Sequence, residues 1–476
     1  MFGQNGNKTN AVRYGLHFFG GCMLKILDFV NRFVWGVPAL LLIMGVGIYL
    51  SVRTSFLQIR LLPRAISFFF SKFMNKKEKK AGSSYRALCT ALGATVGTGN
   101  LAGVAGAIAI GGPGAIFWMW VCGILGMITK FAEAVLSVRY HKKNSAGEWV
   151  GGPMYMIQCG MGSGWTWLAR VYCFFGVVAA FGVGNATQVN TVVGGINDIL
   201  TYLKLDGGLL TNLLIGILLA VLITLLLMGG AKKIGKTAEN LVPVISLLYI
   251  FLCLIVLTAR FRVIPSAFAA IVKGAFSPRA ATGGMIGSVF TALRIGAARG
   301  VFTNEAGMGT AAIAHGAADV HHPVQQGFMG IVEVFLDTIV ICTMTALVIL
   351  CSGVPVPYGV DSGISLTISA FAEIFGEWIC MPITLLLVCL AIATVLGWGL
   401  YGGRCAQYLF GDGAWKSFVW LQGITVIVGA VLNTGVVWML SETVNGLMAI
   451  PNLIALGYLS PELFRLVKEY KPMAYA

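Results

Sequence analysis

The stretch from Leu88 to Thr129 carries no charged side chain, and this limits the possible folds more than any other feature of the sequence. A membrane-spanning helix needs about 20 mostly apolar residues. The stretch is too long for one span, and the turn-forming sequence Gly111-Gly112-Pro113-Gly114 divides it into two. A soluble domain has about 25% charged residues, whereas 11% of these 476 residues are charged and 57% are hydrophobic. The sequence therefore predicts an all-α polytopic membrane protein, not a nucleic-acid-binding, disordered or disulfide-rich secreted protein.

Eleven apolar segments are candidate transmembrane helices, and one of them, at residues 283–318, is interrupted. The first lacks the small-residue cleavage site of a secretory signal, so we interpret it as a membrane helix. Residues 1–32 are expected to form an N-terminal extension, with an interfacial helix at residues 14–32. The eleven segments are 33–52, 87–110, 113–138, 166–197, 208–229, 239–259, 283–318, 327–351, 378–401, 416–433 and 436–459.

Basic side chains are unevenly distributed among the loops between these segments. The chain has 33 Lys and Arg against 18 Asp and Glu, and nine of the basic residues lie between Arg53 and Arg86. Cytoplasmic loops carry the excess of Lys and Arg, so this loop and, by alternation, the basic loops at residues 139–143, 232–236 and 404–416 are predicted to face the cytoplasm. The sequence thus predicts a multi-pass plasma-membrane (cell inner membrane) protein with its N-terminus outside and its C-terminus in the cytoplasm.

Two apolar segments are interrupted by glycine-rich, polar sequence. The first interruption runs from Gly93 to Asn100 and the second from Arg294 to Gly307. They are five segments apart, so they cross the membrane in opposite directions. Paired interruptions in two inverted halves are typical of the binding site of a secondary transporter. Unwound backbone is tolerated in a membrane only where it lines a cavity or binds a ligand.

Several polar residues within these segments are candidates for chemistry. Gly97-Thr98-Gly99-Asn100 offers backbone, a hydroxyl and an amide to a ligand, and we favour this over tight helix packing. Arg294, Arg299 and Glu305 are costly in a bilayer and need partners, for which the available acids are Glu133, Glu333 and Asp337; structural pairing and gating both remain open. The remaining candidates, each with an alternative as a helix contact, are Gln188, Asn190, Thr394 and Trp398.

These motifs resemble those of the alanine or glycine:cation symporter family. The longest matches are Gly97 to Ala105 and Gly111 to Trp120. Shorter ones are Gly151-Gly152-Pro153-Met154-Tyr155, Asn304 to Gly309 and Leu396-Gly397-Trp398. Because they are dispersed along most of the chain, they are far more specific together than any single motif.

The resemblance implies a fold like that of the bacterial leucine transporter, with two inverted five-helix repeats preceded by one extra helix. The extra helix and the basic loop would occupy residues 33–86, the repeats 87–260 and 261–460, and a cytoplasmic tail 461–476. It also implies import of small neutral amino acids, chiefly alanine and glycine, by symport with sodium through alternating access. No cofactor, enzymatic activity or nucleic-acid partner is expected, and the oligomeric state stays open.

The resemblance also implies roles for residues of this chain. The run Thr98-Gly99-Asn100 would hold the substrate carboxylate, backbone carbonyls near Gly296 with Gln188 would take the ammonium group, and Trp398 would limit side-chain size. The sodium ligands would be the backbone carbonyls of Gly93 and Val96 and the hydroxyl of Thr394.

The ninth segment departs from the family pattern Ser-Thr-x-Leu-Gly-Trp-Ser-Tyr-Tyr-Gly-Glu. Ala393 replaces the first Ser, Gly399 and Leu400 replace the next Ser and Tyr, and Gly403 replaces the Glu. Loss of the hydroxyl at position 393 leaves proton coupling as an alternative. Gly399 beside Trp398 would enlarge the pocket, which leaves a larger neutral amino acid such as glutamine as an alternative substrate.

An ion channel is the alternative class of function. The paired interruptions argue against it, because a simple pore needs a ring of equivalent filter residues. A membrane enzyme is disfavoured, since the sequence has no nucleophile elbow, phosphate-binding loop or zinc-protease motif.

Overall fold

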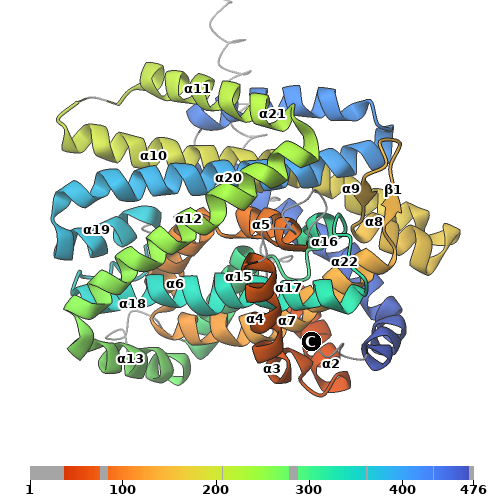
Figure 1. Cartoon of the computed structure of the whole chain (residues 1–476). Coiled ribbons are helices and arrows are strands. Elements are labelled where there is room, and N and C mark those ends of the chain that lie inside the picture. Colours follow the sequence, from red (N-terminus) through yellow and green to blue (C-terminus); the bar gives the residue numbers. More distant parts are fainter. Residues whose placement is uncertain are drawn as a thin grey trace, which may run out of the picture.

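The computed structural model describes residues 37–74, 84–205, 207–277, 288–360, 363–432 and 434–470. Most of these residues are helical, and the sheet that they form is a short antiparallel hairpin of β1 (Lys142–Lys143) and β2 (Trp149–Val150). The predicted N-terminal extension at residues 1–32 lies outside the described residues. Figure 1 shows long helices lying roughly alongside one another, as expected for a polytopic membrane protein.

The helices of the first half of the chain end with a long helix that contains Pro243. In chain order they are α2 (Val37–Arg53), α3 (Leu57–Arg60), α4 (Leu62–Met74), α5 (Ser84–Thr95), the π-helix η2 (Gly99–Gly103), α6 (Val104–Gly111), α7 (Gly114–Arg139), α8 (Pro153–Tyr155), η3 (Met156–Met161), η4 (Ser163–Trp165), α9 (Thr166–Phe181), η5 (Gly182–Ala186), α10 (Thr187–Tyr202), α11 (Leu209–Leu227) and α12 (Gly230–Ala259).

The second half is organised in the same way, with long helices and short irregular turns. Its helices are η6 (Phe261–Val263), α13 (Ile264–Phe276), α15 (Val289–Asn304), α16 (Thr310–His315), α17 (Pro323–Val334), η7 (Phe335–Cys342), α18 (Thr343–Ser352), α19 (Gly363–Phe375), η8 (Glu377–Ile379), α20 (Cys380–Phe410), α21 (Ala414–Val431) and α22 (Thr434–Glu469).

Eight helical stretches of the described residues are long and apolar enough to cross a membrane, and the bent pair of α5 with η2 and α6 makes a ninth. Each of the eleven predicted segments overlaps at least one helix. The predicted number of eleven spans is not confirmed, because α2 has 17 described residues and the interrupted segment yields two helices, α15 of 16 residues and α16 of 6.

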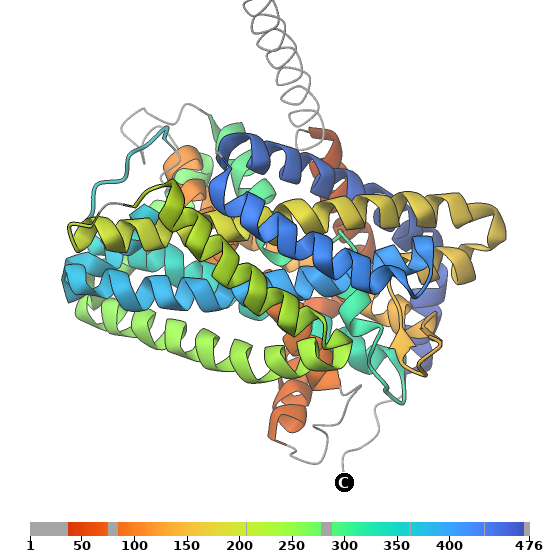
Figure 2. The same cartoon turned by 90° about the horizontal axis from the view of Figure 1, so that it is seen from above.

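Two groups of helices enclose α5. In Figure 1, α10, α11, α20 and α21 lie on one side of it and α7, α17 and α18 on the other, and Figure 2 gives the view from above. The contacts agree with this arrangement, since α11 packs on α21, α10 on α20, and both α15 and α17 on α7, while α5 contacts α12, α17 and α20. The first interrupted helix is therefore central in the molecule.

Glycines allow α7 to pack closely against its neighbours. A Cβ atom added to Gly114 would lie 2.1 Å from the carbonyl carbon of Gly274 in α13. One added to Gly296 in α15 would lie 2.2 Å from the carbonyl oxygen of Ala115. Small residues at such contacts let helix backbones approach in a membrane, so these glycines serve packing.

The basic segment between Arg53 and Arg86, expected to be a loop, contains the helices α3 and α4. Ala65 and Phe68 on α4 are buried, and the Phe68 ring lies 6.1 Å from that of Phe328 in α17. With 13 residues, α4 is too short to span a bilayer. Its apolar face instead packs against the helix bundle, which the search for spans of about 20 residues could not detect.

Candidate functional site

The first predicted interruption is a break in the helix. The helical stretch that begins with α5 bends by 52° between Thr95 and Gly99, where regular α-helical hydrogen bonding stops and the π-helix η2 begins. The backbone N–H of Gly97 donates to the side-chain Oδ1 atom of Asn100 at 2.9 Å. This bond satisfies an amide that the break would leave unpaired in an apolar environment. The location of the first break is therefore as predicted.

The second interruption lies further along the chain than predicted. Helix α15 is continuous from Val289 to Asn304, so the expected unwound backbone near Gly296 is wrong: that glycine packs against α7. The chain leaves the helix at Glu305, which has φ 52°, and Gly307 and Gly309 have φ 93° and 77°. Such left-handed values favour glycine, and they place the break at residues 305–309, outside the predicted ammonium site.

Two of the three predicted sodium ligands lie together. The Oγ1 atom of Thr394 in α20 lies 3.2 Å from the carbonyl oxygen of Gly93 and 3.1 Å from that of Leu390. The side chain of Thr394 is 3% exposed. Val96 follows in the break itself and is also buried. When the hydroxyl donates to Leu390, its lone pairs and the Gly93 carbonyl are free to bind a cation between α5 and α20.

Two predicted substrate residues also meet. The hydroxyl of Thr98 donates to the Oε1 atom of Gln188 in α10 at 2.9 Å, and both side chains are buried. The Nε2 atom of Gln188 donates to the carbonyl oxygen of Val183 at 3.2 Å, inside the π-helix η5. π-Bulges are frequent at functional sites, and here η2 and η5 each adjoin one member of the pair.

Gly99 and Asn100 connect the first break to other helices. A Cβ atom on Gly99 would lie 3.4 Å from the ring of Phe302 in α15. The amide nitrogen of Asn100 donates to the Oδ1 atom of Asp337 in η7 at 2.7 Å, and the hydroxyl of Thr338 donates to its Oδ2 atom at 2.9 Å. The side chain of Asn100 therefore holds the break to η7.

Asp337 is a site residue whose position the sequence analysis did not foresee. It was considered only as a partner for Arg294, Arg299 or Glu305, but the structure brings it to Asn100. The available signal was a carboxylate within the mostly apolar segment of residues 327–351, whose two acidic residues are Glu333 and Asp337, because such residues mark functional positions in membranes.

Trp398 is fixed between the two breaks. Its indole Nε1 atom donates to the Oε1 atom of Glu305 at 2.9 Å, and the side chain is 1% exposed. A Cβ atom on Gly184 in η5 would lie 2.3 Å from the Cβ atom of Trp398. The indole is thus held by a hydrogen bond at one end and by close packing at the other, which suits a rigid wall.

Other residues of the ninth segment pack away from this site. A Cβ atom on Gly399 would lie 2.6 Å from the side chain of Leu227, and one on Gly403 would lie 2.5 Å from that of Trp415. The expectation that Gly399 enlarges the pocket beside Trp398 is therefore wrong. Asn190 donates to the backbone oxygens of Gly429 at 3.3 Å and Leu432 at 3.1 Å, which is its helix-contact alternative.

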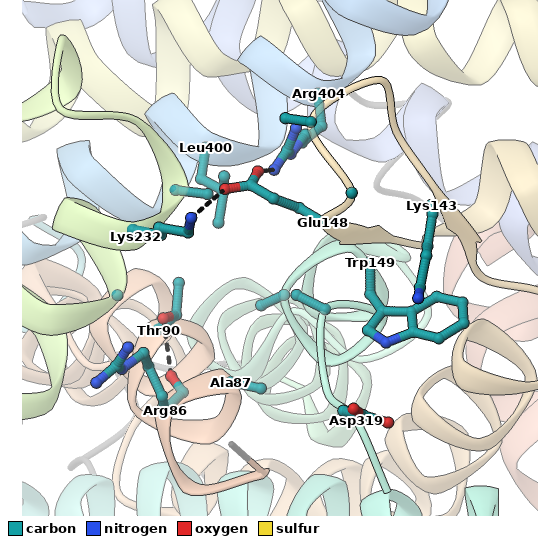
Figure 3. A pocket seen from close by; sticks show the side chains of 16 residues that line it. Arg86, Ala87, Thr90, Lys143, Glu148, Trp149, Lys232, Asp319, Leu400 and Arg404 are labelled. Atoms are coloured by element: carbon teal, nitrogen blue, oxygen red, sulfur yellow. Dashed lines mark hydrogen bonds and ion pairs between the residues drawn. The ribbon is translucent and has the colours of Figure 1, made fainter. Parts of the chain in front are cut away.

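A cavity of about 360 Å³ lies at the end of α5 that is expected to face the cytoplasm (Figure 3). Glu148, from the β-hairpin, pairs across it with Arg404 at 3.0 Å and Lys232 at 3.8 Å. Thr90 also lines the cavity and precedes Gly93 by three residues, just under one helical turn. The cavity therefore approaches the predicted sodium ligands from the side of the basic loops.

Three comparisons with known proteins complete this description. A family model described as "Sodium:alanine symporter family" matches residues 21–475. The chain is 41% identical over 442 residues to "Sodium/alanine symporter AgcS" of Methanococcus maripaludis, covering 92% of this chain and 95% of that protein. It is 35% identical over 449 residues to "Probable sodium/glutamine symporter GlnT" of Bacillus subtilis, covering 94% and 90%.

Among solved structures, the crystal structure of MhsT in complex with L-phenylalanine covers 82% of this chain and 98% of its own. The TM-score is 0.57 and the sequence identity 14%. At this identity the likeness shows the fold alone. MhsT has the fold of the leucine transporter, so this part of the predicted fold class is supported.

Proposed function

The chain belongs to the sodium:alanine symporter family, and from that premise we propose that it imports a small neutral amino acid, alanine or glycine, together with sodium. The observation that carries the proposal is the adjacency of two candidate sites at one broken helix. Thr98 with Gln188 lies at one end of the break, and Gly93 with Thr394 lies about one turn away. An ion and a substrate bound there would share the same unwound backbone.

In this proposal the substrate carboxylate binds the hydroxyl of Thr98 and the backbone of Gly99 and Asn100. The ammonium group binds the Oε1 atom of Gln188, whose side chain is kept oriented by the hydrogen bond that its Nε2 atom donates to the carbonyl oxygen of Val183. Trp398 limits the size of the side chain. Gly296 has no part in it, because that residue packs on α7.

Sodium would bind the backbone carbonyls of Gly93 and Val96 and the hydroxyl of Thr394. Gly93 is on α5 and Thr394 is on α20, so a bound cation holds the two helices together. When sodium leaves, the ionic bridge is lost and the 3.2 Å contact between the Thr394 hydroxyl and the Gly93 carbonyl remains. This weaker link would let α5 move toward the cavity of Figure 3. This gives alternating access a physical basis, since binding at one site favours the conformation that binds at the other.

The arrangement in the membrane is part of the same proposal. It has eleven spans, of which α2 is the extra helix, with inverted repeats at residues 87–260 and 261–460. The N-terminus lies outside and the C-terminal tail in the cytoplasm, as the basic loops require. The protein would reside in the plasma membrane, which is the inner membrane of a cell that has two.

A larger neutral amino acid is the alternative substrate, because a relative 35% identical to this chain is described as a probable sodium/glutamine symporter. Proton coupling is the alternative to sodium, because Ala393 provides no hydroxyl. Membership of a symporter family argues against the ion channel and the membrane enzyme.

Uptake of radiolabelled alanine into proteoliposomes tests the proposal. With an inward sodium gradient we expect saturable uptake that stops when the gradient is collapsed. An equal proton gradient without sodium should give none. Uptake driven by protons alone would refute sodium coupling. Sodium-driven uptake of radiolabelled glutamine, with no uptake of alanine or glycine, would refute the proposed substrate.

A further inference from the structure

A buried cluster of ionisable side chains, which the proposed transport site does not use, lies beside the second break. It contains Lys130 and Glu133 of α7, Glu305, His315 of α16 and Glu333 of α17, and none of these residues is more than 3% exposed. Burying an ion costs several kcal/mol unless it is paired and hydrogen-bonded. The balance of charges within the cluster therefore determines its protonation.

One carboxylate of the cluster, Glu333, is compensated. The ammonium group of Lys130 lies 3.2 Å from its Oε1 atom, and the Nε2 atom of His315 lies 2.8 Å from its Oε2 atom. Ser84 donates to the amide oxygen of Gln326 at 2.5 Å, so the amide nitrogen of Gln326 faces the Nδ1 atom of His315 at 2.7 Å. Nδ1 then accepts and Nε2 donates, which makes the imidazole neutral.

The second carboxylate, Glu133, contacts neutral donors. Its Oε1 atom accepts from the backbone N–H groups of Gly307 at 2.9 Å and Gly309 at 3.0 Å, and from the amide of Asn452 at 2.7 Å. Glu133 thus holds the second break in place. Its Oε2 atom is buried and has no hydrogen-bond partner among the described residues. An anionic oxygen in that position would be left both desolvated and unpaired.

The third carboxylate, Glu305, is likewise bound by neutral groups. The indole of Trp398 donates to its Oε1 atom at 2.9 Å and the hydroxyl of Thr310 to its Oε2 atom at 2.7 Å. The Lys130 ammonium is within electrostatic range of Glu133 and Glu305 as well as Glu333. One ammonium group thus faces three carboxyl groups beside a neutral imidazole, which would leave a net charge of −2 if all three were ionised.

We propose that Glu133 and Glu305 form a proton-binding site, with the proton on the Oε2 atom of Glu133. A proton needs one oxygen atom only, whereas a metal ion there would face the N–H groups that converge on Glu133. The titratable and polar groups that face the pair come from six elements: Lys130 on α7, Tyr172 on α9, Thr310 on α16, Glu333 on α17, Trp398 and Tyr401 on α20, and Asn452 on α22. His315 contacts Glu333, and Gln326 and Ser84 follow His315 in the same chain of hydrogen bonds.

The cavity of Figure 3 provides the side from which protons exchange. It is lined by Ala314 and Leu400, and their chain neighbours His315 and Tyr401 belong to the cluster or adjoin it. Water that enters between α16 and α20 would hydrate the carboxyl groups and favour release of the proton. Because Trp398 joins Glu305 to the proposed substrate site, proton release would accompany opening of that site; this consequence rests on the proposed function.

Infrared spectroscopy of the full-length protein in liposomes tests the site without any substrate. A protonated, buried carboxyl group has a C=O stretching band that ionised carboxylates lack. We expect this band at neutral pH, lost in Glu133→Gln. In Glu305→Gln the band should disappear at a pH at least about one unit lower than in the unsubstituted protein, because removing a nearby negative charge weakens proton binding. Glu462→Gln, which removes a partly exposed carboxylate paired with Arg139, is the matched control and should leave the band unchanged.

The absence of the band from the unsubstituted protein would overturn the proposal, even if no variant folds. So would a band that persists in Glu133→Gln and disappears in Asp337→Asn. In a second arm, sodium and radiolabelled alanine are added and bound alanine is counted in the same sample. Bound alanine with an unchanged band would refute the link to transport, whereas failure to bind alanine would refute the proposed function and leave the proton site standing.

Discussion

Replacement of Thr394 by Val tests the proposed sodium site most specifically. Valine has nearly the same shape as threonine but lacks the hydroxyl, whose oxygen lies 3.2 Å from the carbonyl oxygen of Gly93. Two oxygen atoms at that separation can both lie about 2.4 Å from one cation, a distance typical of oxygen ligands to hard cations. The variant therefore removes one ligand and leaves the Gly93 carbonyl in place.

The expected magnitude follows from the burial of Thr394, which is 3% exposed. Removing one partner from a buried polar group costs about 1–3 kcal/mol. At about 1.4 kcal/mol for each factor of ten, the sodium concentration for half-maximal uptake should rise by about 5-fold to about 150-fold. The maximal rate at saturating sodium should change much less, because the substrate contacts of Thr98 and Gln188 are retained.

The assay is alanine uptake into proteoliposomes over a series of sodium concentrations. Thr425→Val is the matched control, since Thr425 makes the same type of bond to the carbonyl four residues earlier, at 2.9 Å to Leu421, on an exposed face. An unchanged sodium dependence in Thr394→Val, with normal folding, would refute the assignment of this hydroxyl to the cation site.

Four further predictions concern single positions. Thr98→Val and Gln188→Ala each remove one partner of the 2.9 Å hydrogen bond between these side chains. Each should lower alanine uptake at least about ten-fold without changing the elution profile of the purified protein. Near-normal uptake in both variants would contradict the proposed substrate site. Ala393→Ser adds a hydroxyl beside Gly93, where the Cβ atom of Ala393 lies 3.7 Å from a Cβ built on that glycine, and should lower the sodium concentration for half-maximal uptake. Gly397→Ala puts a Cβ atom 2.6 Å from that of Ala94 and should destabilise the protein by about 1–3 kcal/mol, seen as a lower thermal midpoint in detergent. Burial lowers the pKa of His322, whose Nδ1 atom accepts from the N–H of Val324 at the start of α17. The neutral imidazole therefore contributes stability to the folded protein above the unfolded pKa of about 6.5, and this contribution is lost as the pH falls from there through the lower folded-state pKa. His322→Asn should therefore reduce the decrease of the thermal midpoint on acidification.

The first break was predictable because two local signals coincide. Glycines at positions 93, 97 and 99 weaken the helix, and Asn100 supplies a side chain that accepts from the freed amide of Gly97. Both signals lie within about two helical turns of sequence. The adjacency of Gly93 to Thr394 followed only from the family resemblance, because it depends on the packing of α20 against α5.

The second break was misplaced because a glycine has two uses in a membrane helix. Gly296 and Gly300 let α15 approach α7, and a Cβ atom on Gly300 would lie 3.1 Å from that of Cys122. Gly307 and Gly309 instead supply positive φ angles. Sequence alone does not distinguish a packing glycine from a turning one, since the distinction depends on a neighbouring helix.

The buried cluster escaped prediction for a similar reason. Glu133 and Glu333 were considered only as available partners for Arg294, Arg299 and Glu305, and Lys130 was not considered. Its pairing with Glu333 joins α7 to α17, which are far apart in sequence. Long-range pairing of charges follows from the tertiary fold, whereas the number of apolar segments follows from composition.

The affinity for alanine as a function of sodium concentration tests the central claim, that ion and substrate share one broken helix. Equilibrium binding to the purified protein would be measured with and without sodium, and for sodium with and without alanine. We expect each ligand to raise the affinity of the protein for the other by the same factor, as linkage requires. Thr394→Val should reduce this factor. Alanine binding that is equally tight at all sodium concentrations would contradict the account.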